Sequence, residues 1–375
     1  AEDMNQIGQN QDDWDKQFKM TADVNLGAYS GTEFHRIGIR EIYPFNGVFD
    51  GSKHTIWNFT YTAENSDYIG IFGAVGAAGR IENVSLRDVN ITGRNYVGGL
   101  TGNNKGNITN CDSTGKAASP NSTQYTGGLT GFNSGDINNC YSTSAVTSGD
   151  NSAYIGGLTG ENSGNISNCY SMGTVAGGGW SGDIGGLTGY NTGNISNCYA
   201  TGNVNGGYAS SGLGGLVGEN DSGIISNCYA TGSVNGGDAS ENLGGLAGAN
   251  YSGSISSSYF LTSEPNNGCG TPLTDANMKQ QSSFVGWDFV WETANGTDDI
   301  WAICEDVNYP KLARQFVPGD SDNDKDVDLV DFARLGLKWR QANTNLYCGG
   351  MDLTGDGWVN WKDILIMSDH WLEGT

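Results

Sequence analysis

Residues 184–199 read IGGLTGYNTGNISNCY, and near-copies of this phrase run along the middle of the chain. The leucine of GGL recurs at intervals of 29, 29, 29, 29 and 30 residues, at Leu100, Leu129, Leu158, Leu187, Leu216 and Leu246. One cysteine per copy keeps the same period, at Cys111, Cys140, Cys169, Cys198 and Cys228. A period held this strictly indicates a stacked repeat architecture, in which each unit packs on the next.

Each unit contains three short strand-like pieces separated by turn signals such as N-S-G. In the copy at 154–177 these pieces are YIGGLTG, GNISNCYS and GTVAG. None of the units holds the roughly 10–12 residues of helical apolar periodicity that a helical repeat requires. The sequence therefore predicts a mainly β fold, a single-stack parallel β-solenoid with about 29 residues per coil and about 4.8 Å between identical residues of successive coils.

Stacked asparagines are expected to form amide ladders along the axis of such a solenoid. One predicted ladder contains Asn133, Asn162, Asn191 and Asn220, and a second contains Asn110, Asn139, Asn168, Asn197 and Asn227. Ile166 and Cys169 lie three residues apart, so strict strand alternation cannot bury both of them. A bend near Asn168 must intervene, or one of the two side chains faces outward.

The cysteine column is expected to be an inert, buried and reduced ladder, because free Cys behaves as a small hydrophobic residue. A straight line of single thiols cannot supply a tetrahedral zinc site, and the CxxC spacing of redox motifs is absent. The alternative is that some cysteines of neighbouring coils are cross-linked to each other.

The phrases GGLTGENSGNISNCY and GGLTGYNTGNISNCY resemble the GLUG-motif repeats of bacterial secreted and surface proteins. The resemblance covers roughly residues 68–260, extends loosely through YIGIFGAVGAAGRIENVSL, and includes FNGVFDGSKHTIWNF as a lead-in. It implies a solenoid fold and an extracellular location, but no particular reaction.

The charge distribution excludes some classes of binding partner. Lys and Arg total 18 against 41 Asp and Glu, which gives a formal net charge of −23 and argues against nucleic acid or an anionic membrane surface. Between residues 117 and 278 the chain has no Lys, Arg or His. No apolar stretch is long enough to insert into a membrane. The start AEDMNQ is typical of a mature terminus left by signal-peptide cleavage, so we expect a secreted, cell-surface protein.

A solenoid exposes open strand edges at both ends and therefore requires caps. We predict an N-terminal cap with the first irregular coils at 1–67, the repeats at 68–262, an aromatic C-terminal cap at 263–317 and a calcium-binding module at 318–375. In an oxidising compartment, Cys269 and Cys304 are expected to form a disulfide, which leaves Cys348 as a free thiol or an interchain partner.

The last part of the chain holds two acidic loops with the spacing of 12-residue calcium loops, whose ligands occupy positions 1, 3, 5, 7, 9 and 12. Each loop is followed by a short amphipathic stretch, DFARLGLKWR or DILIMSDHWL. Six carboxylates in one loop would repel each other without a cation, so calcium binding is expected to be coupled to folding. The predicted ligands are Asp320, Asp322, Asp324, Asp326, Asp328 and Asp331 in the first loop, and Asp352, Thr354, Asp356, Trp358, Asn360 and Asp363 in the second.

This region, about 318–375, resembles a type I dockerin, a duplicated calcium-loop–helix module that binds cohesin domains. The resemblance implies two Ca²⁺ sites. The first is expected to be weaker, because Lys325 stands where Gly357 supplies the usual sharp turn in the second loop. The small hydroxylated pairs of the family's recognition positions are not evident here, and Phe332-Ala333 and Ile364-Leu365 lie near those positions, which puts binding to a standard cohesin in doubt.

The sequence favours a non-enzymatic extracellular structural protein, a calcium-binding solenoid subunit that assembles head-to-tail or on the cell surface through its end caps and tail. A carbohydrate-binding or adhesive module on a cohesin-type scaffold is the alternative, and a polysaccharide-degrading β-helix enzyme is the second alternative. For the enzyme, Glu161 and Glu219 lie two coils apart with Tyr190 between them, but the same position varies freely in other coils. The predicted partners are the chain itself or a surface scaffold, with glycans as a third class.

Overall fold

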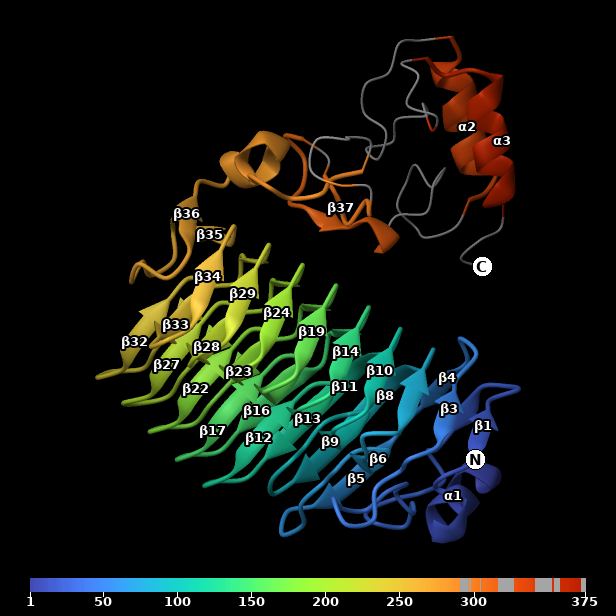
Figure 1. Ribbon diagram of the computed structural model, residues 1–375, viewed down its shortest axis with the longest axis vertical. Coiled ribbons are helices and arrows are strands. Elements are labelled where there is room, and N and C mark those ends of the chain that lie inside the picture. Colours follow the sequence, from blue (N-terminus) through green and yellow to red (C-terminus); the bar gives the residue numbers. More distant parts are fainter. Residues whose placement is uncertain are drawn as a thin grey trace. The chain divides into compact units, whose positions relative to one another are not determined.

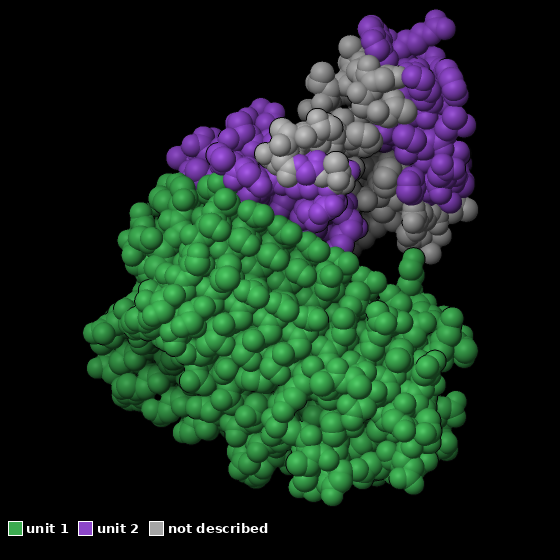
Figure 2. Space-filling model, in the orientation of Figure 1, with its two compact units in different colours: residues 1–272 green, residues 273–375 purple. Residues whose placement is uncertain are grey.

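The computed structural model describes residues 1–290, 296, 298–303, 305–315, 327–340, 353 and 358–371. The chain divides into two compact units, residues 1–272 and 273–375, which are coloured separately in Figure 2. This division falls inside the range expected to form the aromatic C-terminal cap. Each unit is described below by itself.

Unit 1 is a parallel β-solenoid, visible in Figure 1 as a stack of near-identical coils. In the coil at 153–176 the chain forms five short strands: β17 (Ala153–Gly156), β18 (Thr159–Asn162), β19 (Asn165–Ser167), β20 (Tyr170–Ser171) and β21 (Val175–Ala176). The sequence predicted three strands in this coil, YIGGLTG, GNISNCYS and GTVAG. The first two pieces each divide at a corner, one at Gly157–Leu158 and one at Asn168–Cys169.

The strands of successive coils pair in parallel and in register, as Ile108, Ile137, Ile166, Ile195 and Ile225 do. One sheet has nine strands: β1 (Gln17–Lys19), β3 (Val48–Asp50), β7 (Arg80–Glu82), β10 (Asn107–Thr109), β14 (Asp136–Asn138), β19, β24 (Asn194–Ser196), β29 (Ile224–Ser226) and β34 (Ser254–Ser256). Another has seven: β6 (Phe72–Val75), β9 (Thr101–Asn104), β13 (Thr130–Asn133), β18, β23 (Thr188–Asn191), β28 (Val217–Asn220) and β33 (Ala247–Asn250).

Two further sheets complete the coils. Five strands form one of them: β12 (Gln124–Gly127), β17, β22 (Gly182–Gly185), β27 (Ser211–Gly214) and β32 (Glu241–Gly244). The other contains 15 strands: β2 (Val24–Asn25), β4 (Thr55–Trp57), β5 (Thr60–Ala63), β8 (Ser85–Gly93), β11 (Asp112–Ser119), β15 (Tyr141–Ser142), β16 (Ala145–Ser148), β20, β21, β25 (Tyr199–Ala200), β26 (Val204–Asn205), β30 (Tyr229–Ala230), β31 (Val234–Asn235), β35 (Tyr259–Leu261) and β36 (Thr271–Leu273). The expected parallel solenoid is therefore confirmed.

The core of unit 1 is a set of apolar ladders along the solenoid. The GGL leucines are fully buried, and so are the isoleucines of the nine-stranded sheet from Ile108 to Ile225. Burial of each such side chain stabilises the fold by about 1.5–3 kcal/mol. Asn168 adopts a left-handed φ of +54°, and both Ile166 and Cys169 point inward. The predicted bend near Asn168 is thus confirmed.

A buried asparagine ladder runs parallel to the leucines. The Nδ2 group of Asn133 donates to Oδ1 of Asn162 at 2.8 Å, and Asn162 donates to Asn191 at 2.8 Å. The same bond joins Asn104 to Asn133 and Asn220 to Asn250, so the ladder extends one rung beyond each end of the predicted set. The second expected ladder forms in part: Asn227 donates to Asn197, whereas Asn168 donates to Asn138.

The cysteine column is buried and its thiols are free, as expected. Each thiol contacts backbone carbonyls, and burial raises the pKa of the Cys140 and Cys198 thiols well above its usual range. Cys269 is also a free thiol, so the expected disulfide to Cys304 is wrong for this structure, although Cys304 itself lies outside the described residues. Cys269 instead packs against the core, and its N–H donates to Asn267 Oδ1 at 3.1 Å.

Both ends of the solenoid are capped by local chain. At the N-terminal end lie helix α1 (Glu2–Gln9) and the 3₁₀ turn η1 (Gln11–Asp13), and the Trp14 carbonyl accepts the N–H groups of Asn46 and Gly47. At the other end, Glu264 accepts the N–H of Val234, and Asn267 donates to the Ala247 carbonyl. These contacts satisfy backbone groups that an open coil would leave unpaired.

Unit 2 contains short elements and an aromatic cluster in which Trp287 and Trp301 stack with ring centroids 4.3 Å apart. Its elements are η2 (Asn277–Lys279), η3 (Gln281–Ser283), the antiparallel pair β37 (Trp301–Ala302) and β38 (Lys311–Leu312), η4 (Ala313–Gln315), α2 (Leu329–Lys338) and α3 (Trp361–Asp369). Within the described parts of the chain, no helix combines the length and the apolar character needed to cross a membrane.

Candidate functional site

The first candidate site lies at the N-termini of α2 and α3, where the predicted calcium loops end. In α2, Asp328 accepts the N–H of Val330 at 2.7 Å, and Asp331 accepts the N–H of Asp328 at 3.0 Å. In α3, Asn360 accepts the N–H of Lys362 at 3.0 Å, and Asp363 accepts the N–H of Asn360 at 2.7 Å. Both helices therefore begin with the same capping box, formed by the residues predicted at loop positions 9 and 12.

Five of the predicted ligands are described, namely Asp328, Asp331, Trp358, Asn360 and Asp363. Asp331 and Asp363 are fully buried, and carboxylate and amide oxygens are the donors that Ca²⁺ prefers. Within the described ranges, no group of three or more His, Cys, Asp or Glu side chains is arranged to hold a metal ion. The remaining predicted ligands, Asp320, Asp322, Asp324, Asp326, Asp352, Thr354 and Asp356, lie outside those ranges, so calcium binding stays a prediction.

The two helices bury a small core and expose many other apolar side chains. Val327 and Val359, which hold the same position in the two predicted loops, are both fully buried. An apolar cavity of about 200 Å³ is lined by Leu329, Phe332, Ile364, Met367, Ser368 and Trp371. We call the exposed side chains on and beside this cavity the helix-pair surface: Leu329 (72% exposed), Phe332 (45%), Trp361 (62%), Leu365 (54%) and Trp371 (39%).

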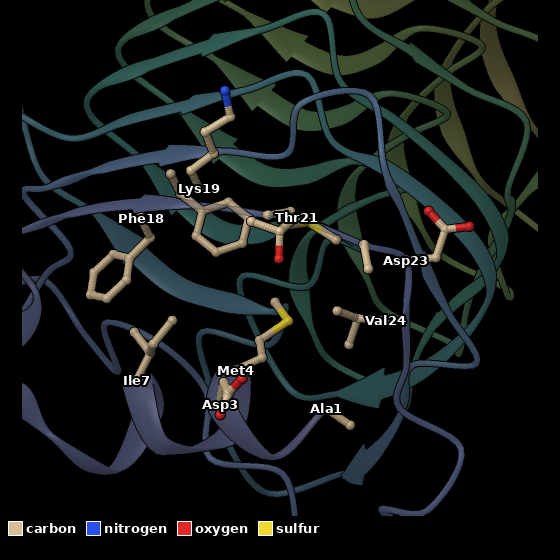
Figure 3. A pocket seen from close by; sticks show the side chains of 12 residues that line it. Ala1, Asp3, Met4, Ile7, Phe18, Lys19, Thr21, Asp23 and Val24 are labelled. Atoms are coloured by element: carbon tan, nitrogen blue, oxygen red, sulfur yellow. The ribbon is translucent and has the colours of Figure 1, made fainter.

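A second apolar cavity lies in the N-terminal cap of unit 1 and has a volume of about 320 Å³. Figure 3 shows Met4 and Ile7 rising from α1 toward Phe18 and Val24. Asp3, Lys19 and Asp23 also line the cavity, as does the exposed Ala22. We refer to this cavity as the N-terminal pocket. The sequence did not predict it, because it forms between α1 and three short strands, β1, β2 and β3, of two successive coils.

The flank of the solenoid carries a row of stacked tyrosines: Tyr68, Tyr96, Tyr125 and Tyr154. Each tyrosine has a left-handed φ between 56° and 63°, and successive ring centroids lie 4.7, 4.5 and 5.2 Å apart. In the next coil the tyrosine is replaced by Asp183, whose φ is +52°, and after it comes Gly212. The tyrosine stack therefore ends at Tyr154.

A carboxyl cluster begins where the tyrosines end. Glu161, Tyr190 and Glu219 occupy one in-register row on β18, β23 and β28, as the sequence predicted. Asp183 hydrogen-bonds to Glu219, and its side chain leans over Gly212. Burial raises the pKa of Glu161 to about 7. Burial, and then the charge of Glu219, raises the pKa of Asp183 to about 8. Burial therefore favours the protonated form of Asp183.

These carboxyl groups predict a pH-dependent stability of the solenoid. The folded pKa values of Asp183 and Glu161 lie above their ordinary values of 3.8 and 4.5, so the folded chain holds more protons than the unfolded chain between these limits. Their stabilising contribution is complete below about pH 4 and is lost as the pH rises through about 7 and 8. The thermal midpoint of the double variant Asp183→Asn/Glu161→Gln should consequently fall less between about pH 5 and about pH 9 than that of the wild type.

Comparing the pH dependence of the thermal midpoint in the wild type and in the double variant isolates the contribution of Asp183 and Glu161. Asp50 and Asp67 have a lowered pKa, caused first by hydrogen bonds from Asn83 and Arg94, and they act in the opposite direction in both proteins. Equal pH slopes in the two proteins would contradict the prediction.

Asp183 was missed by the sequence analysis, although a signal was present. The residue two positions before the first glycine of GGL, or before the equivalent Gly70, is Tyr in the coils from Tyr68 to Tyr154, and Asp183 is the first departure from that row. Its partner Glu219 lies one coil further on and in a different sheet, so only the corner at Gly185–Gly186 brings the two carboxyl groups together.

Comparison with known proteins supports the repeat architecture. Residues 93–118, 181–205 and 209–235 match the family described as the GLUG motif. A stretch of 124 residues is 31% identical to halomucin of Haloquadratum walsbyi and covers 32% of this chain. A stretch of 99 residues is 35% identical to a candidate Gly-rich membrane protein of Evansella cellulosilytica and covers 25% of this chain. The matches span only 1% and 11% of these two relatives.

A solved structure shares the fold. The chain superposes with a TM-score of 0.54 on a Bacteroides ovatus protein described as a candidate immunoglobulin A1 protease, over 80% of this chain and 86% of that one. The two are 20% identical, so the likeness concerns the fold alone. The chain is therefore a mainly β parallel solenoid that carries repeats of the GLUG motif.

Proposed function

We propose that this chain is a non-enzymatic structural protein of the cell surface or the extracellular space, and that it assembles head-to-tail through the two ends of the chain. A surface location is supported by the name of one relative, a Gly-rich membrane protein. The repeats between residues 117 and 278 contain no Lys, Arg or His, which leaves few residue types for acid–base catalysis there.

The observation that carries this proposal is the pair of complementary apolar features in the two units. The N-terminal pocket of about 320 Å³ has room for a large apolar side chain, and the helix-pair surface exposes leucine, phenylalanine and tryptophan. Exposed apolar groups in such number on two short helices mark an interaction surface. A contact between the pocket of one copy and the helices of the next is heterologous, and such contacts repeat into open filaments.

We assign calcium the role of folding the helix pair. The 12 predicted ligands would form two Ca²⁺ sites of the dockerin type, and both helices begin at residues of this set. Bound Ca²⁺ would neutralise the crowded carboxylates and hold the loops ahead of each capping box. Without calcium, charge repulsion within the loops would unfold the helix pair and remove the surface that contacts the next copy.

Attachment to a cohesin-type scaffold is the second candidate, since it follows from the dockerin resemblance. Self-assembly is favoured because Phe332 and Ile364, which lie near the positions where that family carries small hydroxylated residues, line the apolar cavity. Apolar side chains at these positions suit an apolar partner such as the N-terminal pocket.

Sedimentation velocity on two end-blocked variants tests the assembly. Leu329→Glu places a charge on the helix-pair surface at the first position of α2, where the helix dipole tolerates a carboxylate. Ala22→Trp fills the N-terminal pocket from an exposed position. In calcium, the wild type should sediment as polymers and each variant as a monomer. A mixture of the two variants should form dimers and nothing larger, because only one productive contact remains.

Tyr251→Ala is the matched control, since Tyr251 is 65% exposed on a turn of the repeats, and it should polymerise like the wild type. Polymers of normal size in either blocked variant would overturn the head-to-tail arrangement. A wild type that stays monomeric in calcium but binds a cohesin domain would favour the scaffold instead.

A further inference from the structure

Two exposed aromatic rings interrupt the otherwise small and polar corner that precedes β22 and β27. Trp180 is 59% exposed and Tyr208 is 54% exposed, and their ring centroids lie 5.4 Å apart in an edge-to-face arrangement. The two residues belong to adjacent coils, and the N–H of Trp180 donates to the Tyr208 carbonyl at 2.7 Å. Together they form an aromatic pair on the flank of the solenoid.

Trp180 occupies a position that strongly disfavours a bulky residue. Its φ is +53°, and the equivalent residues of the other coils share this left-handed conformation. These residues are small or suited to it: Ser122, Asn151, Ala209 and Ala239. A large side chain with positive φ is strained, and such strain concentrates at functional positions. The Trp180 ring is mostly exposed, so the strain is not compensated by burial of the ring in the core.

The backbone between the aromatic pair and the carboxyl cluster has an open position at Gly182. A Cβ atom placed on Gly182 would meet only the Ser211 carbonyl oxygen, at 4.0 Å. Asp183 follows Gly182 directly and lies three residues after Trp180, so the Cα atoms of Trp180 and Asp183 are at most roughly 10 Å apart. The rings, the open position and the carboxyl pair thus lie in sequence along the same coils.

We propose that Trp180, Tyr208, Asp183 and Glu219 form a binding site for a neutral oligosaccharide. The C–H faces of sugar rings pack against exposed aromatic rings, and the carboxyl oxygens accept hydrogen bonds from sugar hydroxyl groups. The absence of Lys, Arg and His between residues 117 and 278 leaves a uronate or sulfated glycan without a counter-charge in these repeats.

A protein partner fits this surface less well. Stable protein interfaces bury about 800 Å² on each partner around an apolar centre. Here the rings are flanked by Gly177–Gly179, Ser181 and Asp150, whose carboxylate accepts the Gly179 N–H at 2.8 Å. Two aromatic rings surrounded by hydroxyl groups, carboxyl groups and glycine backbone match the mixed apolar and polar surface of a sugar.

Affinity electrophoresis of the full chain tests the site, with native gels that contain a soluble β-glucan, xylan, mannan, galactan or polygalacturonate. At least one neutral polysaccharide should retard the wild type, while polygalacturonate should not. Trp180→Asn installs the residue that Asn151 supplies at the same corner, so the fold should be retained. This variant should bind about tenfold more weakly or worse, as expected for loss of a central aromatic contact. Asp183→Gly, which removes the carboxyl group and installs the residue that Gly212 supplies in the next coil, should also weaken binding.

Tyr251→Ala is the control, since Tyr251 is an exposed tyrosine on a different turn, and its binding should equal that of the wild type. The proposal is overturned if no neutral polysaccharide retards the chain, if Trp180→Asn or Asp183→Gly binds as well as the wild type, or if only a protein partner binds this surface. The inference does not depend on the calcium-driven assembly proposed above. Binding is measured with calcium and with chelator. If the polysaccharide retards the chain in both conditions, sugar binding does not depend on calcium-driven assembly, and the two proposals are tested separately.

Discussion

Replacement of Asn162 by leucine is expected to lower the free energy of unfolding of the solenoid by about 3 kcal/mol or more, because it breaks the buried amide ladder in the middle. Asn162 is fully buried, accepts from Asn133 and donates to Asn191, each at 2.8 Å. Its Oδ1 also accepts the N–H of Gly164. Leucine offers none of these groups, so polar atoms on three neighbouring residues would lose a partner without access to water.

Urea unfolding followed by circular dichroism measures this effect through the shift of the transition midpoint. Asn165→Ala, three residues further along the same coil, is the matched control for Asn162→Leu. Asn165 is exposed and also stands in an amide ladder, donating to Asp136 and accepting from Asn194 at 2.8 Å. Because water can replace exposed hydrogen bonds, the control should lose no more than about 0.5 kcal/mol. Similar losses in the two variants would show that burial of the ladder has no special role.

The substitution Gly157→Ala is expected to be comparably damaging, since it adds a methyl group between two coils. A Cβ atom at this position would lie 2.1 Å from Ser171 Oγ and 2.2 Å from the Gly186 carbonyl oxygen. The second contact is with backbone of the next coil, which cannot move without disturbing the leucine ladder at Leu187. Overpacking of this kind costs about 3 kcal/mol at the upper end of its usual range.

Gly182→Ala provides the internal comparison, because the same methyl group there has open space around it. We expect the urea midpoint of Gly182→Ala to stay close to that of the wild type and that of Gly157→Ala to fall clearly. If both variants unfolded at the wild-type midpoint, the close approach of coils at the GGL corner would be contradicted.

Much of the solenoid could be predicted because one physical quantity, the repeat period, determines which residues stack. The spacing of the GGL leucines and of the cysteines predicts parallel in-register coils, buried apolar columns and the central asparagine ladder. The five-strand coil was not predicted. Its corners depend on left-handed φ angles at residues such as Asn168, and local polarity alone does not distinguish such a corner from a continuing strand.

Features that combine different coils or sheets were harder to predict. Asn104 and Asn250 extend the ladder at the same repeat position, four residues after the GGL leucine, so the sequence carried this signal although the predicted ladder omitted both. The Asp183–Glu219 contact depends on a side chain leaning over Gly212, and the N-terminal pocket forms between a helix and three separate strands. The disulfide predicted from compartment and cysteine count was wrong, because Cys269 packs as part of the cap of unit 1.

The candidate calcium site divides between what is described and what stays predicted. The capping boxes at Asp328 and Asn360 agree with the loop spacing, since the residues predicted at loop positions 9 and 12 form both partners of each box. Phe332 and Ile364, which depart from the dockerin pattern in the sequence, line an apolar cavity that the sequence did not predict. Spacing therefore predicts the calcium site, whereas the apolar surface follows only from the packing of both helices.

Calcium removal from the purified wild-type chain tests the central claim most directly. Sedimentation velocity is recorded in calcium, after addition of EGTA, and again after calcium is restored. The proposed function predicts polymers in calcium, monomers with an intact solenoid signal in EGTA, and polymers once more on restoration. A chain that remains monomeric throughout, or polymers that persist unchanged in EGTA, would contradict calcium-dependent head-to-tail assembly.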